Sequence, residues 1–83
     1  MLNIKVLGSG CANCKRLEQL TRKAVDQLGV EAEVSKVTDP TQYADYGVLA
    51  TPGLVINGKT VSSGRVPSLA EITSFVTSAL AVS

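Results

Sequence analysis

Histidine is absent from the sequence, and its absence narrows the chemistry that the chain can perform. Histidine is the side chain that most often acts as a general base near neutral pH and most often binds a metal ion. An excess of charge of one sign is also missing, because eight Lys and Arg residues nearly balance seven Asp and Glu residues and leave a net charge of +1. Surfaces for nucleic acid or anionic lipid normally carry a clear excess of positive charge. We therefore expect no nucleic-acid partner and no membrane partner.

Long apolar segments are missing as well. Residues 1–6 alternate between polar and apolar side chains, unlike the apolar stretch of a signal peptide. The most apolar segment, residues 75–82, is short and interrupted by Thr and Ser, so it does not fit a bilayer span. The sequence therefore predicts a soluble cytoplasmic protein. Its length of 83 residues with 45% hydrophobic residues predicts one globular domain, residues 1–83, and a monomer is the default for this size.

Cysteine occurs only twice, as Cys11 and Cys14. Two cysteines this close together cannot join distant loops, so a structural disulfide framework is not expected. In a reducing compartment, the spacing C-x-x-C indicates either redox chemistry or metal binding.

The periodicity of the apolar residues predicts an α/β fold with the element order β-α-β-α-β-β-α. The first two strands flank a helix and should run parallel, joined by a right-handed crossover. Asn57-Gly58 is a strong hairpin signal, which makes the last two strands antiparallel. These rules predict a four-stranded mixed sheet with helices on both faces. The expected strands are residues 2–7, 30–37, 53–56 and 59–63, and the expected helices are residues 11–28, 40–46 and 68–80.

The two cysteines fall at the start of the first predicted helix, after the turn Gly8-Ser9-Gly10. Cys11 at the N-cap would place its sulfur over the free N–H groups of the first turn, where the helix dipole favours the reactive thiolate. Cys14, one turn further, would face the core. This asymmetry suggests that Cys11 attacks a substrate disulfide and that Cys14 then resolves the mixed disulfide. The plainer alternative is that both cysteines are buried small hydrophobic residues.

Three segments share their order and motifs with a known group of proteins: residues 6–15, which hold the C-x-x-C motif, residues 50–59, which hold Thr51-Pro52 before the hairpin, and residues 64–68. On these segments the sequence resembles the thioredoxin–glutaredoxin superfamily, and most closely the small thioredoxin-like group often called redox-active disulfide proteins. The resemblance implies a minimal thioredoxin fold and a thiol–disulfide oxidoreductase or electron carrier of the protein disulfide reductase type. It also implies a cis Thr51–Pro52 bond lying against the cysteines, where the Thr51 backbone could pair with an extended partner segment. The residues expected to contact the substrate are Gly10, Ala12, Asn13, Thr51 and Pro52.

Several positions depart from thioredoxin itself. Gly10 replaces the aromatic residue before the first cysteine, Ala12-Asn13 replaces Gly-Pro, and Lys5 stands where a buried acid is usual. The sequence thus offers no carboxylate as a proton shuttle. Because the Ala-Asn dipeptide lacks the histidine of strongly oxidising relatives, we expect a reducing protein.

The expected partners are a client protein disulfide and an electron donor, either a thioredoxin-reductase-like enzyme or glutathione. We expect no cofactor other than the Cys11–Cys14 disulfide and no metal. For glutathione, Arg65 and the helix start at Ser68 could hold a carboxylate. A capping serine and a solvated arginine are the simpler explanation of these two residues.

Metal transport is the strongest rival function. Gly-x-x-Cys-x-x-Cys after a first strand also resembles the copper chaperone domains, which hold Cu(I) or another soft metal between two thiolates. Those domains run β-α-β-β-α-β and usually carry Met two residues before the first cysteine, where this sequence has Ser9. A tetrahedral zinc site lacks two of its four ligands unless two chains combine. A third alternative is an interaction module whose disulfide is incidental.

Overall fold

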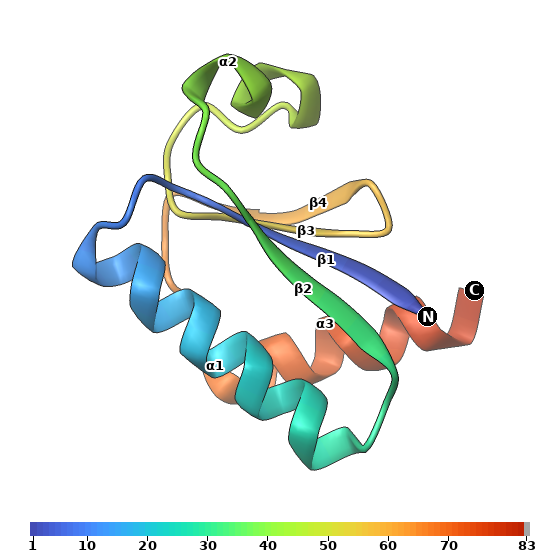
Figure 1. Ribbon diagram of the computed structural model, residues 1–83. Coiled ribbons are helices and arrows are strands. Elements are labelled where there is room, and N and C mark those ends of the chain that lie inside the picture. The colour runs from blue at the N-terminus through green and yellow to red at the C-terminus, as the bar shows by residue number, and fades with distance from the viewer. Residues whose placement is uncertain (83) are drawn as a thin grey trace.

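The computed structural model describes residues 1–82 of the chain, and these form a four-stranded sheet with helices on both faces (Figure 1). The strand order is β2-β1-β3-β4, with β1 and β2 parallel and the other neighbouring pairs antiparallel. The elements are β1 (Leu2–Leu7), α1 (Ala12–Leu28), β2 (Ala32–Val37), α2 (Pro40–Tyr43), the 3₁₀ turn η1 (Ala44–Tyr46), β3 (Gly53–Ile56), β4 (Lys59–Ser63) and α3 (Leu69–Val82). The fold class predicted from the sequence is confirmed.

The larger hydrophobic core lies between the sheet and the two long helices, which Figure 1 shows on the same side of the sheet. Successive side chains of a strand point to opposite faces, so alternate residues of β1 enter this core and the others face away. Its fully buried members come from β1, α1, β3 and α3: Ile4, Leu17, Ala24, Leu54, Ile72 and Val76.

A smaller core fills the opposite face of the sheet. Leu7, Val37, Val48 and Val55 pack there, and the rings of the α2–η1 segment lie against them. The segment begins at Pro40 with Asp39 as its N-cap, because the Asp39 carboxylate accepts a hydrogen bond from the Thr41 N–H at 3.0 Å. The short helix predicted at this place is thus present, and its second half is a 3₁₀ turn.

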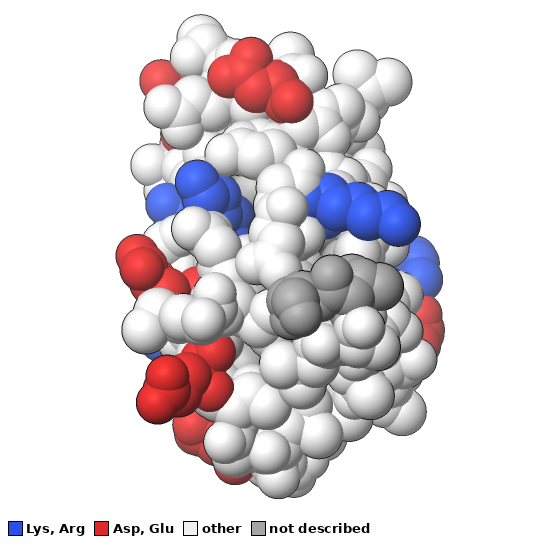
Figure 2. Space-filling view, turned by 90° about the vertical axis from the view of Figure 1, so that its right-hand side faces the viewer, with Lys and Arg blue, Asp and Glu red and all other residues white. Residues whose placement is uncertain are grey.

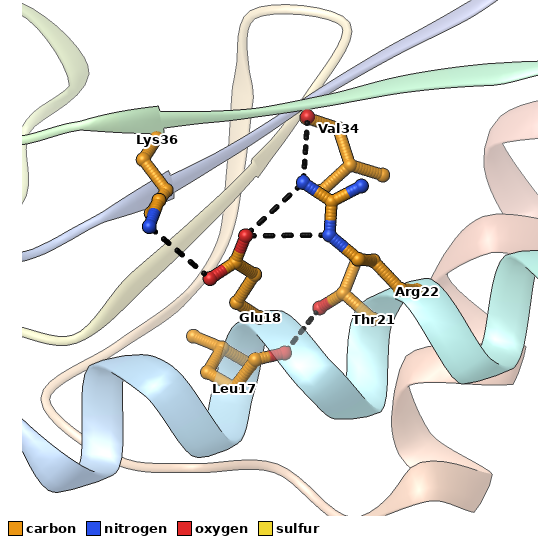
Figure 3. A network of polar contacts seen from close by, with 6 residues as sticks. All are labelled: Leu17, Glu18, Thr21, Arg22, Val34 and Lys36. Atoms are coloured by element: carbon orange, nitrogen blue, oxygen red, sulfur yellow. Dashed lines mark hydrogen bonds and ion pairs between the residues drawn. The ribbon is translucent and has the colours of Figure 1, made fainter.

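Helix α1 holds its position through both apolar and polar contacts. Its inner face buries Leu17 and, unexpectedly, Thr21, whose hydroxyl donates a hydrogen bond to the Leu17 carbonyl at 2.7 Å. On the outer side, the Glu18 carboxylate pairs with Arg22 at 3.0 Å and with Lys36 of β2 at 3.5 Å (Figure 3). The Arg22 guanidinium and the Lys36 ammonium lower the pKa of Glu18 below its usual range, mainly through the Arg22 hydrogen bond. This network ties the middle of α1 to the sheet edge.

The start of β2 differs from the sequence prediction. β2 begins at Ala32 and not at Val30, because its register with β1 pairs Ala32 with Leu2, the first residue of β1. The final helix is capped by Ser68, whose hydroxyl accepts a hydrogen bond from the Glu71 N–H at 3.2 Å.

The hairpin turn is bonded to the start of β1 through Asn57. The Asn57 side-chain oxygen accepts a hydrogen bond from the Asn3 N–H, and the Asn57 N–H donates one to the Asn3 carbonyl.

The charged side chains are mixed in sign. On the side of the molecule where β1 begins, Figure 2 shows basic side chains across the middle with acidic ones above and below them. Among residues 1–82, the structure has no helix that is both long and apolar enough to cross a membrane.

Candidate active site

Cys11 is the N-cap of α1, and its sulfur is bonded to that of Cys14 in a disulfide. The Cys11 backbone is still extended, with φ −68° and ψ 163°, so its side chain can turn in over the first helical turn. There the sulfur accepts a hydrogen bond from the Cys14 N–H, with an N–S distance of 3.1 Å. The two Cα atoms are 5.0 Å apart, within the range usual for disulfides. The N-cap position predicted for Cys11 is confirmed.

The two cysteines differ in their exposure to solvent. Cys11 is exposed, whereas Cys14 is buried, with only 5% of its surface accessible. Cys14 lies on the inner face of α1 in the same row as Leu17. Only Cys11 is therefore open to a partner molecule, and the helix N-terminus that favours a thiolate lies beneath its sulfur.

The loop that precedes β3 meets the cysteines near the end of β1. A side chain built on Gly8 would overlap with the Cys14 sulfur and come within 3.9 Å of the Thr51 Cβ, so these three residues converge on one spot. The Thr51–Pro52 peptide bond is cis. Thr51 is exposed and Pro52 is buried, and the Pro52 carbonyl accepts a hydrogen bond from the Gly64 N–H at 3.0 Å.

The other residues predicted to contact a substrate surround the disulfide. Gly10 precedes Cys11 with a positive φ of 79° and has open space where a side chain would be. Ala12 and Asn13 form the exposed start of α1 between the cysteines. Asn13 also lines an open groove of about 530 Å³ that runs between α1 and the start of α3.

Arg65 and Ser68, considered above as partners for a glutathione carboxylate, are engaged within the chain. The Arg65 guanidinium pairs with the Glu71 carboxylate at 2.7 Å, and Ser68 caps α3. The hydrogen bond from Arg65 is the main cause that lowers the pKa of Glu71 below its usual range. The capping role of Ser68 is confirmed, and Arg65 is part of an exposed ion pair rather than a free solvated side chain.

Lys5 occupies the strand position where thioredoxins usually carry a buried acid, but it faces away from α1. Its ammonium donates a hydrogen bond to the Tyr46 hydroxyl at 3.2 Å and lies 5.7 Å from the centre of that ring. Its neighbours in sequence, Ile4 and Val6, point into the core beneath α1. Lys5 thus fastens η1 to the sheet from the opposite face.

Comparison with known proteins agrees with this geometry. The thioredoxin domain family matches residues 2–77. The chain belongs to the thioredoxin family. Among curated relatives, a thioredoxin of Methanothermobacter thermautotrophicus is 43% identical over 72 residues, which cover 87% of this chain and 94% of the relative. A thioredoxin of Methanocaldococcus jannaschii is 39% identical over 72 residues, covering 87% of this chain and 83% of the relative.

Membership in the thioredoxin family, together with the Cys11–Cys14 disulfide, supports a thiol–disulfide oxidoreductase whose redox group is part of the protein. The metal carrier considered from the sequence is not supported. The element order places two antiparallel strands before a final helix, which is not the order of copper chaperone domains. Within residues 1–82, His, Cys, Asp and Glu side chains form no group of three or more that could hold a metal ion.

Gly8 is a site residue that the sequence pattern did not reveal. In the sequence it ends a strand as part of Gly8-Ser9-Gly10 and stands three residues before Cys11, and no contact with Cys14 is predicted for it. The structure gives it a second role, because the Cys14 sulfur occupies the space next to its α-carbon. The available signal was its place between a buried strand and a C-x-x-C motif.

Proposed function

We propose that the chain is a protein disulfide reductase in which Cys11 is the nucleophile and Cys14 the resolving thiol. The observation that carries this proposal is the contrast between the two sulfurs. Cys11 is exposed at the N-cap of α1, and its sulfur accepts a hydrogen bond from the Cys14 N–H, whereas Cys14 is buried behind it. A hydrogen-bond donor at a helix N-terminus stabilises a thiolate, and burial in apolar surroundings disfavours one.

The reaction consists of two exchanges. The Cys11 thiolate attacks one sulfur of the client disulfide, so that the client S–S bond breaks, a Cys11–client bond forms and one client thiolate leaves. Cys14 then loses its proton to solvent and attacks the Cys11 sulfur, which forms the Cys11–Cys14 bond and releases the second client thiolate. The client gains two electrons, and the cysteine pair loses them.

The surroundings of the disulfide suit an extended polypeptide as the client. Thr51 is exposed beside the pair, and its backbone would supply strand-like hydrogen bonds to a client segment. Pro52 would shape this loop, and the exposed residues Gly10, Ala12 and Asn13 would border the same contact. The absence of large side chains at these positions favours many clients over one.

The proposal includes an electron donor, because each turnover leaves the pair oxidised. A thioredoxin-reductase-like enzyme or glutathione would return two electrons to the Cys11–Cys14 disulfide. A reducing compartment such as the cytoplasm suits this cycle, since there the pair would spend most of its time as a dithiol. We propose that residues 1–83 act as one domain and as a monomer that carries electrons between donor and client.

Reduction of insulin disulfides, with dithiothreitol as the electron source, tests the proposal. Wild type should accelerate insulin reduction, Cys11→Ser should abolish the acceleration, and Cys14→Ser should accumulate a covalent Cys11–insulin adduct visible by mass spectrometry. The proposal fails if wild type gives no acceleration, or if Cys14→Ser traps nothing and reduces insulin as fast as wild type. Tight Cu(I) binding by reduced wild type without any disulfide exchange would favour the metal carrier.

A further inference from the structure

We propose that Gly8 is a positioning residue for Cys14, and that its missing side chain sets the stability of the Cys11–Cys14 disulfide relative to the dithiol. The inference rests on the proposed function, in which Cys14 resolves the mixed disulfide. Gly8 lies outside the C-x-x-C motif. It contributes by lacking a side chain, which leaves room for the Cys14 sulfur.

The first argument is steric. An ideal Cβ on Gly8 would overlap with the Cys14 sulfur and approach the Cys14 Cβ to 3.0 Å. Carbon and sulfur atoms that are not bonded cannot share that space, so any side chain at position 8 displaces the sulfur. Gly8 also has a φ of 157°, a backbone conformation that L-amino acids with side chains rarely adopt. Glycine at this position therefore lets the sulfur pack directly against the backbone.

The second argument is that neither partner can easily move away. The Gly8 N–H donates a hydrogen bond to the carbonyl of Val37, the last residue of β2, at 3.0 Å, so the end of β1 is fixed to its neighbour. On the other side, the Cys14 sulfur is bonded to Cys11, and α1 is packed against the sheet through the fully buried Leu17. The overlap must therefore be relieved at the sulfur itself.

The consequence for the chemistry follows from the two redox states. In the disulfide, the Cys14 sulfur is confined to one position by its bond to Cys11. In the dithiol that bond is absent, and the side chain can rotate to another staggered rotamer. A methyl group at position 8 thus disfavours the disulfide more than the dithiol. It makes the pair harder to oxidise, and it hinders Cys14 in reaching the Cys11 sulfur during resolution.

The test measures the equilibrium between the Cys11–Cys14 disulfide and glutathione in the full chain. For Gly8→Ala we expect the equilibrium constant for oxidation of the cysteine pair by glutathione disulfide to fall by about tenfold. A general loss of stability does not produce this effect, because it is specific to the disulfide. Gly29→Ala is the matched control. Gly29 also has a positive φ, 64°, and no atom lies within 4 Å of its ideal Cβ. An equal shift in both variants, or none in Gly8→Ala, overturns the proposal.

A double-mutant cycle covers the case in which Gly8→Ala folds poorly. With the cysteines oxidised, Gly8→Ala should lower the free energy of unfolding much more than it does in the Cys14→Ala background, where the overlapping sulfur is gone. If Gly8→Ala is insoluble, recovery of soluble protein in Gly8→Ala/Cys14→Ala counts as the same result. Equal losses in both backgrounds overturn the proposal.

These measurements are independent of client turnover. If wild type fails to reduce insulin but Gly8→Ala still shifts the glutathione equilibrium, the proposed function is wrong and the role of Gly8 stands. If insulin is reduced but neither the equilibrium nor the double-mutant cycle links Gly8 to Cys14, only the role of Gly8 is refuted.

Discussion

The Cys14 backbone N–H points at the Cys11 sulfur, 3.1 Å away, so one helical turn both joins the two sulfurs and stabilises charge on one of them. The donor belongs to the residue whose own sulfur is buried. The same short segment therefore exposes one sulfur beside a hydrogen-bond donor and buries the other.

The first prediction concerns the reduced protein. Iodoacetamide should alkylate Cys11 at least about tenfold faster than Cys14, because alkylation needs an accessible thiolate. Peptide mass spectrometry after short exposure measures both sites in one sample. Denatured protein is the control, and there the two rates should become similar. Faster labelling of Cys14 in the folded protein would contradict the assignment of roles.

Much of the fold could be predicted because its local signals agree with its long-range contacts. The alternation along β1, the glycine that ends α1 and the Asn57-Gly58 turn each specify their element without help from the rest of the chain. The start of β2 could not be placed in the same way. The alternation continues upstream of Ala32, and only pairing with Leu2 defines the first strand residue.

The site was predictable where the chemistry is local and not where it depends on space. The N-cap position of Cys11 follows from the turn before it, and the inward face of Cys14 follows from helical spacing. The contact of Gly8 with the Cys14 sulfur does not, because the sequence shows a glycine but not which atom packs against it. Lys5 and Tyr46 are 41 residues apart, and neither segment contains a pattern that predicts their hydrogen bond.

The second prediction tests the core beneath α1. Leu17→Ala should lower the free energy of unfolding by about 2–5 kcal/mol, because Leu17 is fully buried between α1 and the sheet. Urea denaturation followed by circular dichroism measures this loss. Leu49→Ala is the matched control, since Leu49 is 96% exposed and the same substitution there should cost less than about 0.5 kcal/mol. Similar losses in both variants would contradict the packing described.

The third prediction concerns acid and Glu18. Because the pKa of Glu18 is lower in the folded protein than its ordinary value of 4.5, the carboxylate stabilises the fold above that pH. This contribution is lost as the pH falls through the lowered pKa. Glu18→Gln should therefore reduce stability at pH 7 and flatten its decline below about pH 4.5.

Urea midpoints at pH 7 and pH 3 measure the Glu18 effect. Glu33→Gln serves as the control, because Glu33 is an exposed carboxylate on β2 and makes no ion pair within residues 1–82. It should change the pH dependence less than Glu18→Gln. A Glu18→Gln variant that declines as steeply as wild type between the two pH values would refute the role given to the Arg22 and Lys36 contacts.

The fourth prediction separates Lys5 from the redox chemistry. Lys5→Met should lower the free energy of unfolding by about 1 kcal/mol, because it removes the hydrogen bond to Tyr46. Insulin reduction should stay within about twofold of wild type, since Lys5 faces away from α1 and its loss leaves the first helical turn intact. Tyr46→Phe is the control and should have a similar effect on stability. A large loss of reductase activity in Lys5→Met alone would assign Lys5 a part in proton transfer.

The strand order leaves β2 and β4 at the two edges of the sheet. Open edges attract other extended chains and can seed aggregation, and charged side chains or bulges are the usual protection. Here β2 carries Glu33 and Lys36, and β4 begins with Lys59 and pairs with β3 through a register shift at Leu54 and Val55. In the proposed function, extended client segments would pair next to Thr51 and not with the edges of the sheet. The charged side chains of both edges and the register shift beside β4 would disfavour such pairing away from the disulfide.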